Sequence, residues 1–220
     1  MPDFKIVLGN KNYSSWSLRP WLALKQTGAA FDEIVIPLDE PQTKEQILRH
    51  SPSGKVPALV HGSLTVWDSL AICEYLAEQF PAAGLWPVDP AARAVARSAA
   101  AEMHSGFVPL RQALPMIVRR TYPAKPLAPD VQENVNRITA IWLDCRTRFG
   151  SKAEGPFLFG AFSIADAMYA PVVTRFRTYS VDLTSDAAAY VKAVWETPSM
   201  QEWIEAAKRE PWINTKYETD

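Results

Sequence analysis

A chain of 220 residues, 48% of them hydrophobic and 21% charged, has the composition of an ordinary globular protein and can bury the core of one large domain or two small ones. Its formal net charge of -1 gives no electrostatic reason to expect nucleic acid or an anionic membrane as a partner. The first apolar run is too short for a signal peptide and no later run approaches a membrane span, so we expect a cytoplasmic protein.

The cysteines and histidines give no sign of a metal or redox centre. Cys73 and Cys145 are far apart and lie in helix-like segments, where lone cysteines usually serve as small buried hydrophobic residues. The histidines have no cysteine or carboxylate at the spacing of a zinc site, so we expect no metal. The phosphate-binding patterns GxGxxG and GxxxxGK(S/T) and the hydrolase pattern GxSxG are also absent. Several large enzyme classes are thereby excluded.

Strand and helix signals alternate over the first part of the chain. Apolar residues at helical spacing predict a helix that Gly28 closes. Two short apolar runs flanking a turn predict a hairpin, and Asp68 or Ser69 is expected to cap the next helix. The predicted order is strand, helix, strand, short helix or turn, hairpin and helix, over residues 4–8, 17–27, 31–38, 43–49, 56–67 and 70–80. This order predicts a small α/β domain with a mixed four-stranded sheet.

The rest of the chain is predicted to be helical. A segment rich in proline, glycine and alanine is typical of a linker. Beyond it, apolar residues recur every three or four positions and predict helices near residues 91–120, 129–149, 163–181 and 186–209. Ser163 and Asp166 match a capping box, which would serve folding. We therefore expect an α/β domain over residues 1–81, a linker over 82–90, and an all-helical bundle over 91–220.

Three motifs carry a resemblance to a known family. The chain has SPSGKVPAL at residues 51–59 and DSLAICEYL at residues 68–76. It also has SSWSLRPWLAL at residues 14–24. Together these motifs resemble the glutathione S-transferase superfamily, and the last is most similar to its serine-type, zeta-like classes. The resemblance covers the whole chain and implies a thioredoxin-like first domain, an all-helical second domain, glutathione as co-substrate and a homodimer.

The resemblance implies a position for glutathione, and the chemistry of the residues agrees with it. Pro57 cannot donate to a strand ladder, and a cis Val56–Pro57 bond, as in thioredoxin-like proteins, would turn the Val56 backbone outward to pair with the cysteinyl part. A helix N-terminus suits a carboxylate, so Ser69 is expected to hold the γ-glutamyl carboxylate and Asp68 the ammonium group. Lys55 would contact the glycyl carboxylate. A plain helix cap and a solvated lysine are the structural alternatives.

Ser14 and Ser15 are the candidate catalytic residues. Redox proteins with a thioredoxin-like fold carry Cys-x-x-Cys at this place, whereas this chain has Ser14-x-x-Ser17. A serine cannot form a mixed disulfide, but its hydroxyl can donate a hydrogen bond to the thiolate of bound glutathione. Pro20 is incompatible with regular helix before about Trp16. We therefore expect Ser14 and Ser15 on the loop, with Ser17 as the cap. Ser14 is the predicted thiol-activating residue and Ser15 the alternative.

The helix predicted over residues 91–120 supplies candidates for the substrate site and for a dimer. Four of its residues lie along one side and would face an apolar substrate, with packing in the core or at a dimer face as the alternative: Met103, His104, Phe107 and Arg111. Alanines near the start of this helix would let two such helices approach closely in a two-fold homodimer.

Several functions are compatible with these motifs. The leading hypothesis is a detoxifying transferase that activates the glutathione thiol for attack on, or isomerisation of, a small electrophile. A glutathione peroxidase-like or maleylacetoacetate isomerase-like enzyme is one alternative. Asp68 in place of glutamine and Pro20 in place of valine depart from the zeta pattern and argue against carrying over the isomerase substrate. A non-catalytic module that binds protein partners is the other alternative, and the retained ligand contacts argue against it.

Overall fold

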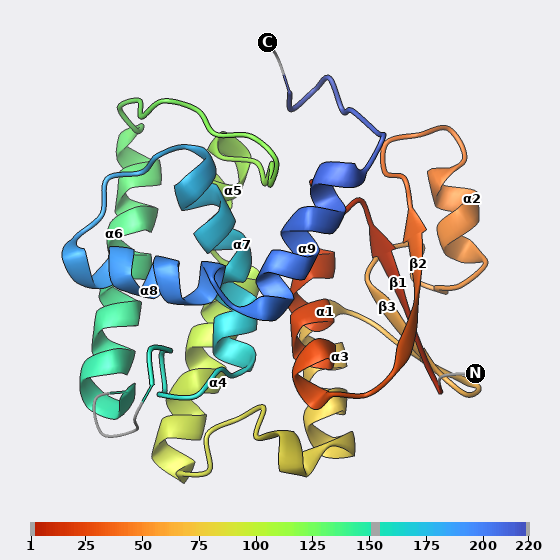
Figure 1. Ribbon diagram of the computed structural model, residues 1–220, viewed down its shortest axis with the longest axis horizontal. Coiled ribbons are helices and arrows are strands. Elements are labelled where there is room, and N and C mark those ends of the chain that lie inside the picture. Colours follow the sequence, from red (N-terminus) through yellow and green to blue (C-terminus); the bar gives the residue numbers. More distant parts are fainter. Residues whose placement is uncertain (1–2, 151–154, 219–220) are drawn as a thin grey trace.

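The computed structural model describes residues 3–150 and 155–218, with a four-stranded sheet on one side of the molecule (Figure 1). The strands are β1 Phe4–Gly9, β2 Phe31–Ile36, β3 Ala58–His61 and β4 Leu64–Val66, in the spatial order β2-β1-β3-β4. β1 pairs parallel with β2 and antiparallel with β3, and β3 and β4 form a hairpin. The predicted mixed sheet and its hairpin are confirmed.

Helices cover both faces of the sheet because side chains alternate along each strand. Ile6 of β1 belongs to the main core, together with residues of α1 (Ser15–Thr27) and α3 (Ser69–Gln79). Val7 faces the other way and packs in a smaller cluster with a residue of α2 (Thr43–Leu48). Figure 1 shows α1 and α3 on one side of the sheet and α2 on the other. This is the thioredoxin-like arrangement that the sequence predicts.

Helix α1 begins earlier than predicted. Ser14, and not Ser17, is the N-cap, because the Ser14 Oγ accepts the N–H of Ser17 at 3.3 Å. Ser15 is the first helical residue, so its predicted place on the loop is wrong. Pro20 permits this start, because a proline in the second turn removes only one helical N–H while the Ser14 cap stabilises the first turn. Gly28 ends the helix with a φ of 72°, as predicted.

The single helix predicted over residues 91–120 is in fact two. α4 spans Pro90–Ser105 and α5 spans Val108–Ala113, and between them Phe107 has a φ of 61°. Arg111, in α5, stabilises this break, because its guanidinium hydrogen-bonds to carbonyl groups that the end of α4 leaves without helical partners. It donates hydrogen bonds to the backbone oxygens of Met103, His104 (3.0 Å) and Gly106 (3.0 Å). The apolar spacing continues through this break, which is why the sequence pattern missed it.

The helix predicted over residues 186–209 is also interrupted. α8 spans Ser185–Trp195 and α9 spans Pro198–Arg209. Thr197 caps α9, its Oγ1 accepting the N–H of Met200 at 3.3 Å, and a proline is well tolerated as the first helical residue. The other two predicted helices are single: α6, Pro129–Cys145, which continues into a π-helical turn at Arg146–Gly150, and α7, Ile164–Thr178.

Helix α7 joins the two halves of the molecule. It is buried along nearly its whole length and packs against both α1 and α4. The predicted capping box is present at its start, where the Asp166 carboxylate accepts the Ser163 N–H at 2.8 Å and the Ser163 hydroxyl at 2.9 Å. Because α1 belongs to the sheet layer and α7 to the helical layer, the two layers share one core.

The connection between the layers and the two cysteines complete the fold. A 3-10 turn at Pro81–Ala83 leads from α3 toward α4. Cys73 and Cys145 are free and buried as predicted, and burial raises the pKa of both thiols.

Over residues 3–150 and 155–218, no helix has the length and hydropathy required to cross a bilayer. The same ranges contain no group of three or more His, Cys, Asp or Glu side chains that could hold a metal ion.

Candidate active site

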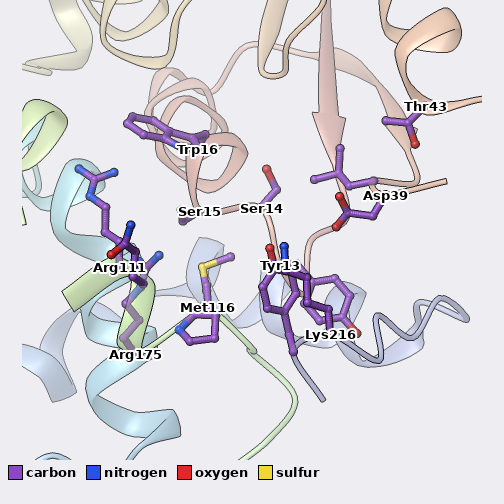
Figure 2. A pocket seen from close by; sticks show the side chains of 14 residues that line it. Tyr13, Ser14, Ser15, Trp16, Asp39, Thr43, Arg111, Met116, Arg175 and Lys216 are labelled. Carbon is purple, nitrogen blue, oxygen red and sulfur yellow. The ribbon is translucent and has the colours of Figure 1, made fainter. Parts of the chain in front are cut away.

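Two cavities share Trp16, at the N-terminal end of α1, as a wall. The larger cavity, about 630 Å³, lies where the loop before α1 meets α5, α7 and the C-terminal tail, and Ser14 and Ser15 line it (Figure 2). The smaller cavity, about 290 Å³, lies between the loop before β3 and the start of α3. It brings together the four predicted glutathione contacts, Lys55, Val56, Asp68 and Ser69.

The smaller cavity contains hydrogen-bonding groups that the protein itself leaves unused. The Val56–Pro57 bond is cis, as the resemblance implies, and neither the N–H nor the C=O of Val56 has a hydrogen-bond partner among the described residues. Ser69 is fully buried, and its Oγ also has no partner in the part of the chain that the structure describes. A buried polar group without a partner costs free energy. Both residues therefore suit a polar ligand that extends along this cavity.

Asp68 combines the structural role with a second contact. Its Oδ1 accepts the N–H groups of Leu70 at 3.0 Å and Ala71 at 3.4 Å, so it is the N-cap of α3. Its Oδ2 lies 3.2 Å from Nε2 of His104 on α4, and its side chain remains 56% exposed. The carboxylate is therefore fixed in place and still accessible to a cation. Lys55, at the same cavity, is exposed and forms no ion pair with any described residue.

The serines before and within α1 form a chain of hydrogen bonds. The backbone N–H of Gly9, the last residue of β1, donates to the Ser17 Oγ at 3.0 Å. The Ser14 hydroxyl donates to the same Ser17 Oγ at 2.7 Å. Hydroxyl protons rotate, so the Ser14 proton can be redirected to an acceptor that enters the larger cavity. Ser15, in contrast, has no side-chain hydrogen bond within the described ranges.

Cationic side chains surround Trp16. The Arg19 and Arg111 guanidinium carbons lie 4.4 Å and 4.8 Å from the centroid of its ring, and the His104 ring packs edge-on at 5.3 Å. Arg19 is fully buried, and none of its three guanidinium nitrogens has a hydrogen-bond partner among the described residues. Burial, followed by the nearby charges of Arg111 and Arg175, lowers the pKa of Arg19.

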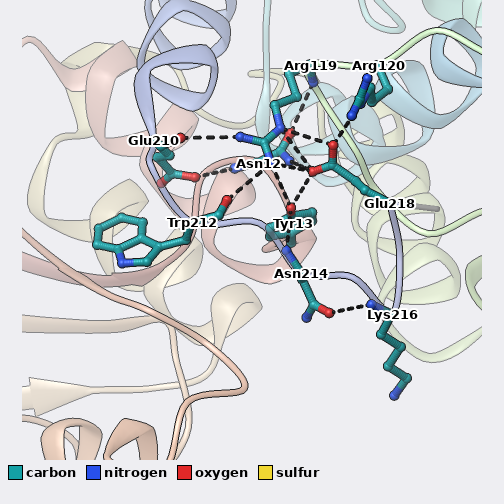
Figure 3. A network of polar contacts seen from close by, with 9 residues as sticks. All are labelled: Asn12, Tyr13, Arg119, Arg120, Glu210, Trp212, Asn214, Lys216 and Glu218. Atoms are coloured by element: carbon teal, nitrogen blue, oxygen red, sulfur yellow. Dashed lines mark hydrogen bonds and ion pairs between the residues drawn. The ribbon is translucent and has the colours of Figure 1, made fainter. Parts of the chain in front are cut away.

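The C-terminal tail holds the loop that precedes Ser14 (Figure 3). The Glu218 carboxylate accepts hydrogen bonds from Asn12 at 3.0 Å, from Tyr13, and from Arg119 at 2.5 Å. Arg120 donates to the same carboxylate at 2.8 Å. Burial alone would raise the pKa of Glu218, but the hydrogen bonds from Arg119, Tyr13 and Arg120 outweigh it and lower the pKa to about 2. The tail therefore fixes one wall of the larger cavity through an ionised, buried carboxylate.

The four residues predicted for the substrate pocket divide into two pairs. Met103 is fully buried in the core and Phe107 is 8% exposed, so both take the alternative role of core packing. His104 lines the smaller cavity and Arg111 the larger one.

Sequence reasoning missed several residues of the larger cavity. Arg175 lies on α7, and Lys216 and Tyr217 belong to the tail. Trp16 lines the cavity and Ser17 lies behind Ser14, but the sequence assigned Trp16 no role and Ser17 only that of a helix cap. Only the SSWSLRP motif itself could have drawn attention to Trp16 and Ser17. No local pattern marks the others, because each reaches the site through tertiary packing.

The structure thus joins a thioredoxin-like domain, with a cis Val56–Pro57 bond, to a helical bundle. Family models agree with this architecture. The model of the glutathione S-transferase N-terminal domain matches residues 13–79, and that of the C-terminal domain matches residues 99–206.

Individual proteins give the same result. The chain is 31% identical over 186 residues to glutathione S-transferase F14 of Arabidopsis thaliana. The aligned region covers 80% of this chain and 68% of that protein. It is 29% identical over 176 residues to maleylacetoacetate isomerase of Rattus norvegicus, covering 77% and 76% respectively. A crystal structure of a glutathione transferase homologue from Burkholderia with bound glutathione superimposes with a TM-score of 0.67 at 26% identity, covering 93% of this chain and 97% of that one. The chain belongs to the glutathione S-transferase family.

Proposed function

We propose that the protein binds glutathione along the smaller cavity, with its sulfur at the mouth of the larger one. Ser69 and the α3 N-terminus would hold the γ-glutamyl carboxylate, and Asp68 would hold the ammonium group. The Val56 backbone would pair with the cysteinyl unit as a short added strand, and Lys55 would contact the glycyl carboxylate. The observation that carries this proposal is the set of unused groups, the Ser69 hydroxyl and the Val56 backbone, in one cavity.

The thiol is proposed to be activated by Ser14. The position of Ser14 supports this assignment, because Ser14 lines the larger cavity and its proton, which the Ser17 hydroxyl accepts, can rotate to a thiolate. A hydrogen bond to a charged acceptor contributes roughly 1.5–3 kcal/mol, so the pKa of bound glutathione should fall. The thiolate then attacks an electrophilic carbon in the larger cavity, the leaving group departs with its electron pair, and the thiol proton passes to solvent. We propose detoxification of small electrophiles in the cytoplasm as the setting.

Binding and thiolate formation are tested separately from turnover. Isothermal titration calorimetry should detect glutathione binding to the purified chain, and ultraviolet absorbance of the complex should reveal thiolate at neutral pH. Retention on glutathione-agarose gives a rapid first answer. A chain that binds no glutathione by any of these measurements contradicts the proposal, and the non-catalytic alternative would then be favoured.

Isomerisation is the second candidate, and the similarity to rat maleylacetoacetate isomerase favours it. In this reaction the thiolate adds to a conjugated double bond, a single bond rotates, and the thiolate leaves again without being consumed. The same residues would serve both reactions up to the attack. The two are distinguished by product analysis, because conjugation consumes glutathione in proportion to product whereas isomerisation leaves its concentration unchanged.

A two-fold homodimer is also proposed. The alanines of α4 lie on two faces: Ala96 and Ala100 are fully buried within the chain, where α4 packs on α7, whereas Ala94 and Ala101 are exposed and available to a second copy. Further support comes from Leu64 and Trp67, in and just after the edge strand β4, which are 46% and 47% exposed and offer apolar surface to a second copy. Light scattering should report twice the chain mass of 24.6 kDa. A monomer that still binds glutathione would show that the site is complete in one chain.

A further inference from the structure

A third cavity, of about 360 Å³, borders the larger one on the side of the C-terminal tail. Its walls come from the end of α5, the loop between α5 and α6, the first turn of α6 and the segment after α7. Three tyrosines line it, Tyr122, Tyr179 and Tyr217, together with apolar residues such as Leu127 and Val131. We call it the tyrosine cavity. Its volume lies within the range of small-molecule sites.

The wall between the tyrosine cavity and the larger cavity is thin. Tyr217 lines both cavities, and at the end of α5 Leu114 lines the first whereas Pro115 lines the second. The α5 part of this wall is fixed from α7, because the Leu114 carbonyl accepts a hydrogen bond from Arg175 Nε at 2.8 Å. The Tyr179 hydroxyl donates to the Pro115 carbonyl at 3.0 Å. The Tyr217 hydroxyl has no hydrogen-bond partner among the described residues, so this side chain is the part of the wall that can turn aside.

The opposite wall of the tyrosine cavity is a preformed aromatic surface. The Tyr122 and Tyr179 rings stack with their centroids 5.6 Å apart and their planes at 23°. The Tyr122 backbone is held on both sides: its N–H donates to the Thr178 carbonyl at 2.6 Å, and its C=O accepts the Ser180 hydroxyl at 2.7 Å. A surface that is ordered before binding loses little entropy when a ligand reaches it.

We propose that the tyrosine cavity takes an aromatic ring of the electrophile, carried on an extension that passes Tyr217 from the larger cavity. The inference rests on the proposed function, because it describes the electrophile that the same site accepts. Aromatic rings attract one another in offset-stacked or edge-to-face arrangements, which a wall of tyrosines offers. The site then accommodates an electrophile in two parts, with its reactive carbon near Ser14 and its ring beyond Tyr217.

Polar groups around the tyrosine cavity add a preference within this class of ligand. The hydroxyls of Tyr122 and Tyr217 and the ammonium group of Lys125 form no hydrogen bond or ion pair with any described residue. A hydrogen-bond acceptor on the ring would find donors there, since a phenol hydroxyl and an ammonium group both donate.

The experiment measures, by isothermal titration calorimetry, the binding of glutathione conjugates whose S-alkyl chains end in a methyl, a cyclohexyl or a phenyl group. Chains of four, six and eight carbons carry the terminal group different distances from the sulfur. For at least one chain length, the wild-type protein should bind the phenyl-terminated conjugate about tenfold or more tightly than the methyl-terminated one. It should also bind the phenyl conjugate about threefold more tightly than the cyclohexyl conjugate, because only the flat ring makes aromatic contacts.

Two variants test whether the ring lies in the tyrosine cavity. Tyr122→Leu removes one aromatic wall, and Ala113→Trp fills the cavity from its exposed rim. Each should reduce the phenyl gain to about threefold or less and abolish the preference over cyclohexyl. Ala189→Trp adds the same side chain at an exposed position of α8, away from the three cavities, and should keep the full gain. Binding of S-methylglutathione by every variant demonstrates that its fold and glutathione site are intact.

The outcomes separate this inference from the proposed function. Equal affinity for the phenyl and methyl termini at every chain length overturns the inference. A phenyl gain that survives in both Tyr122→Leu and Ala113→Trp overturns it too, since the ring then binds elsewhere, such as against Trp16 in the larger cavity. A cyclohexyl terminus that binds as tightly as phenyl overturns the assignment to an aromatic ring. If glutathione and S-methylglutathione themselves fail to bind, it is the proposed function that fails.

Discussion

The two cavities that meet at Trp16 are built in opposite ways. The smaller one is formed mainly by two short segments close together in the sequence, with Trp16 and His104 beside them. Its polar groups include the Val56 backbone, the α3 N-terminus, and the side chains of Lys55, Asp68 and Ser69. The larger one draws its cationic groups, Arg111, Arg175 and Lys216, from α5, α7 and the C-terminal tail, and the loop before α1 adds the Ser14 hydroxyl. One half of the site is therefore set by the local chain and the other by tertiary packing.

This contrast predicts that the larger cavity is the more vulnerable half. Glu218 is 7% exposed and joins the tail to Arg119 and to the loop that carries Tyr13. Glu218→Gln leaves those cations without their anion, which should lower the free energy of unfolding by about 3–5 kcal/mol. Chemical denaturation would measure this loss. Glu205→Gln, at an exposed carboxylate that pairs with Lys208 at 2.8 Å, is the matched control and should change stability little.

The same carboxylate gives a pH dependence with a defined sign. The pKa of Glu218 is about 2 in the folded chain, below its ordinary value of 4.5. A lowered carboxyl pKa stabilises the fold above the ordinary value, and this contribution disappears as the pH falls from about 4.5 toward 2. Wild-type stability should therefore fall over this interval more steeply than that of Glu218→Gln. Parallel curves for the two proteins would contradict the role given to Glu218.

Arg19 should respond in the opposite direction. It is buried without a hydrogen-bond partner among the described residues, so replacing it by a hydrophobic side chain of similar length removes a desolvated charge. We expect Arg19→Met to raise the free energy of unfolding of the ligand-free protein by roughly 2–3 kcal/mol. A variant less stable than wild type would show that Arg19 has a compensating partner.

Ser14 provides the link between the cavities, because it lies where the proposed glutathione sulfur enters the larger one. Ser14→Ala should cost about 2 kcal/mol of thiolate stabilisation and raise the pKa of bound glutathione by about 1.5 units. Ser17→Ala, which removes the hydroxyl that accepts the Ser14 proton, should change this pKa less. The thiolate absorbance of the complex measured against pH reports both values. An unchanged pKa in Ser14→Ala, with a raised one in Ser15→Ala, would transfer the role to Ser15.

The contrast between the cavities also decides how much the sequence could predict. The sheet, the cis-proline loop and the α3 N-terminus follow from contiguous motifs, so Val56 and Ser69 are found together as predicted. The sequence did not predict the helix breaks at Phe107 and Thr197, because apolar residues keep their helical spacing across both. Arg111 hydrogen-bonds to the end of α4 at the first break, and a proline begins the next helix at the second. The sequence did not identify Arg175 as a site residue, because its place there depends on the packing of α7 against α1. The residues around it in the sequence have the pattern of an ordinary buried helix.

The smallest expected effect separates two adjacent residues of the glutathione cavity. Asp68 caps α3, so Asp68→Ala should lower the free energy of unfolding by about 1 kcal/mol and also weaken glutathione binding. The Ser69 hydroxyl makes no hydrogen bond with any described residue, so Ser69→Ala should weaken binding without loss of stability. In both variants the thiolate pKa should stay constant, because these groups contact the end remote from the sulfur. Calorimetry with glutathione and with cysteinylglycine, which lacks the γ-glutamyl group, measures the contact directly. Equal losses of affinity for the two peptides would show that Asp68 and Ser69 do not bind the γ-glutamyl end.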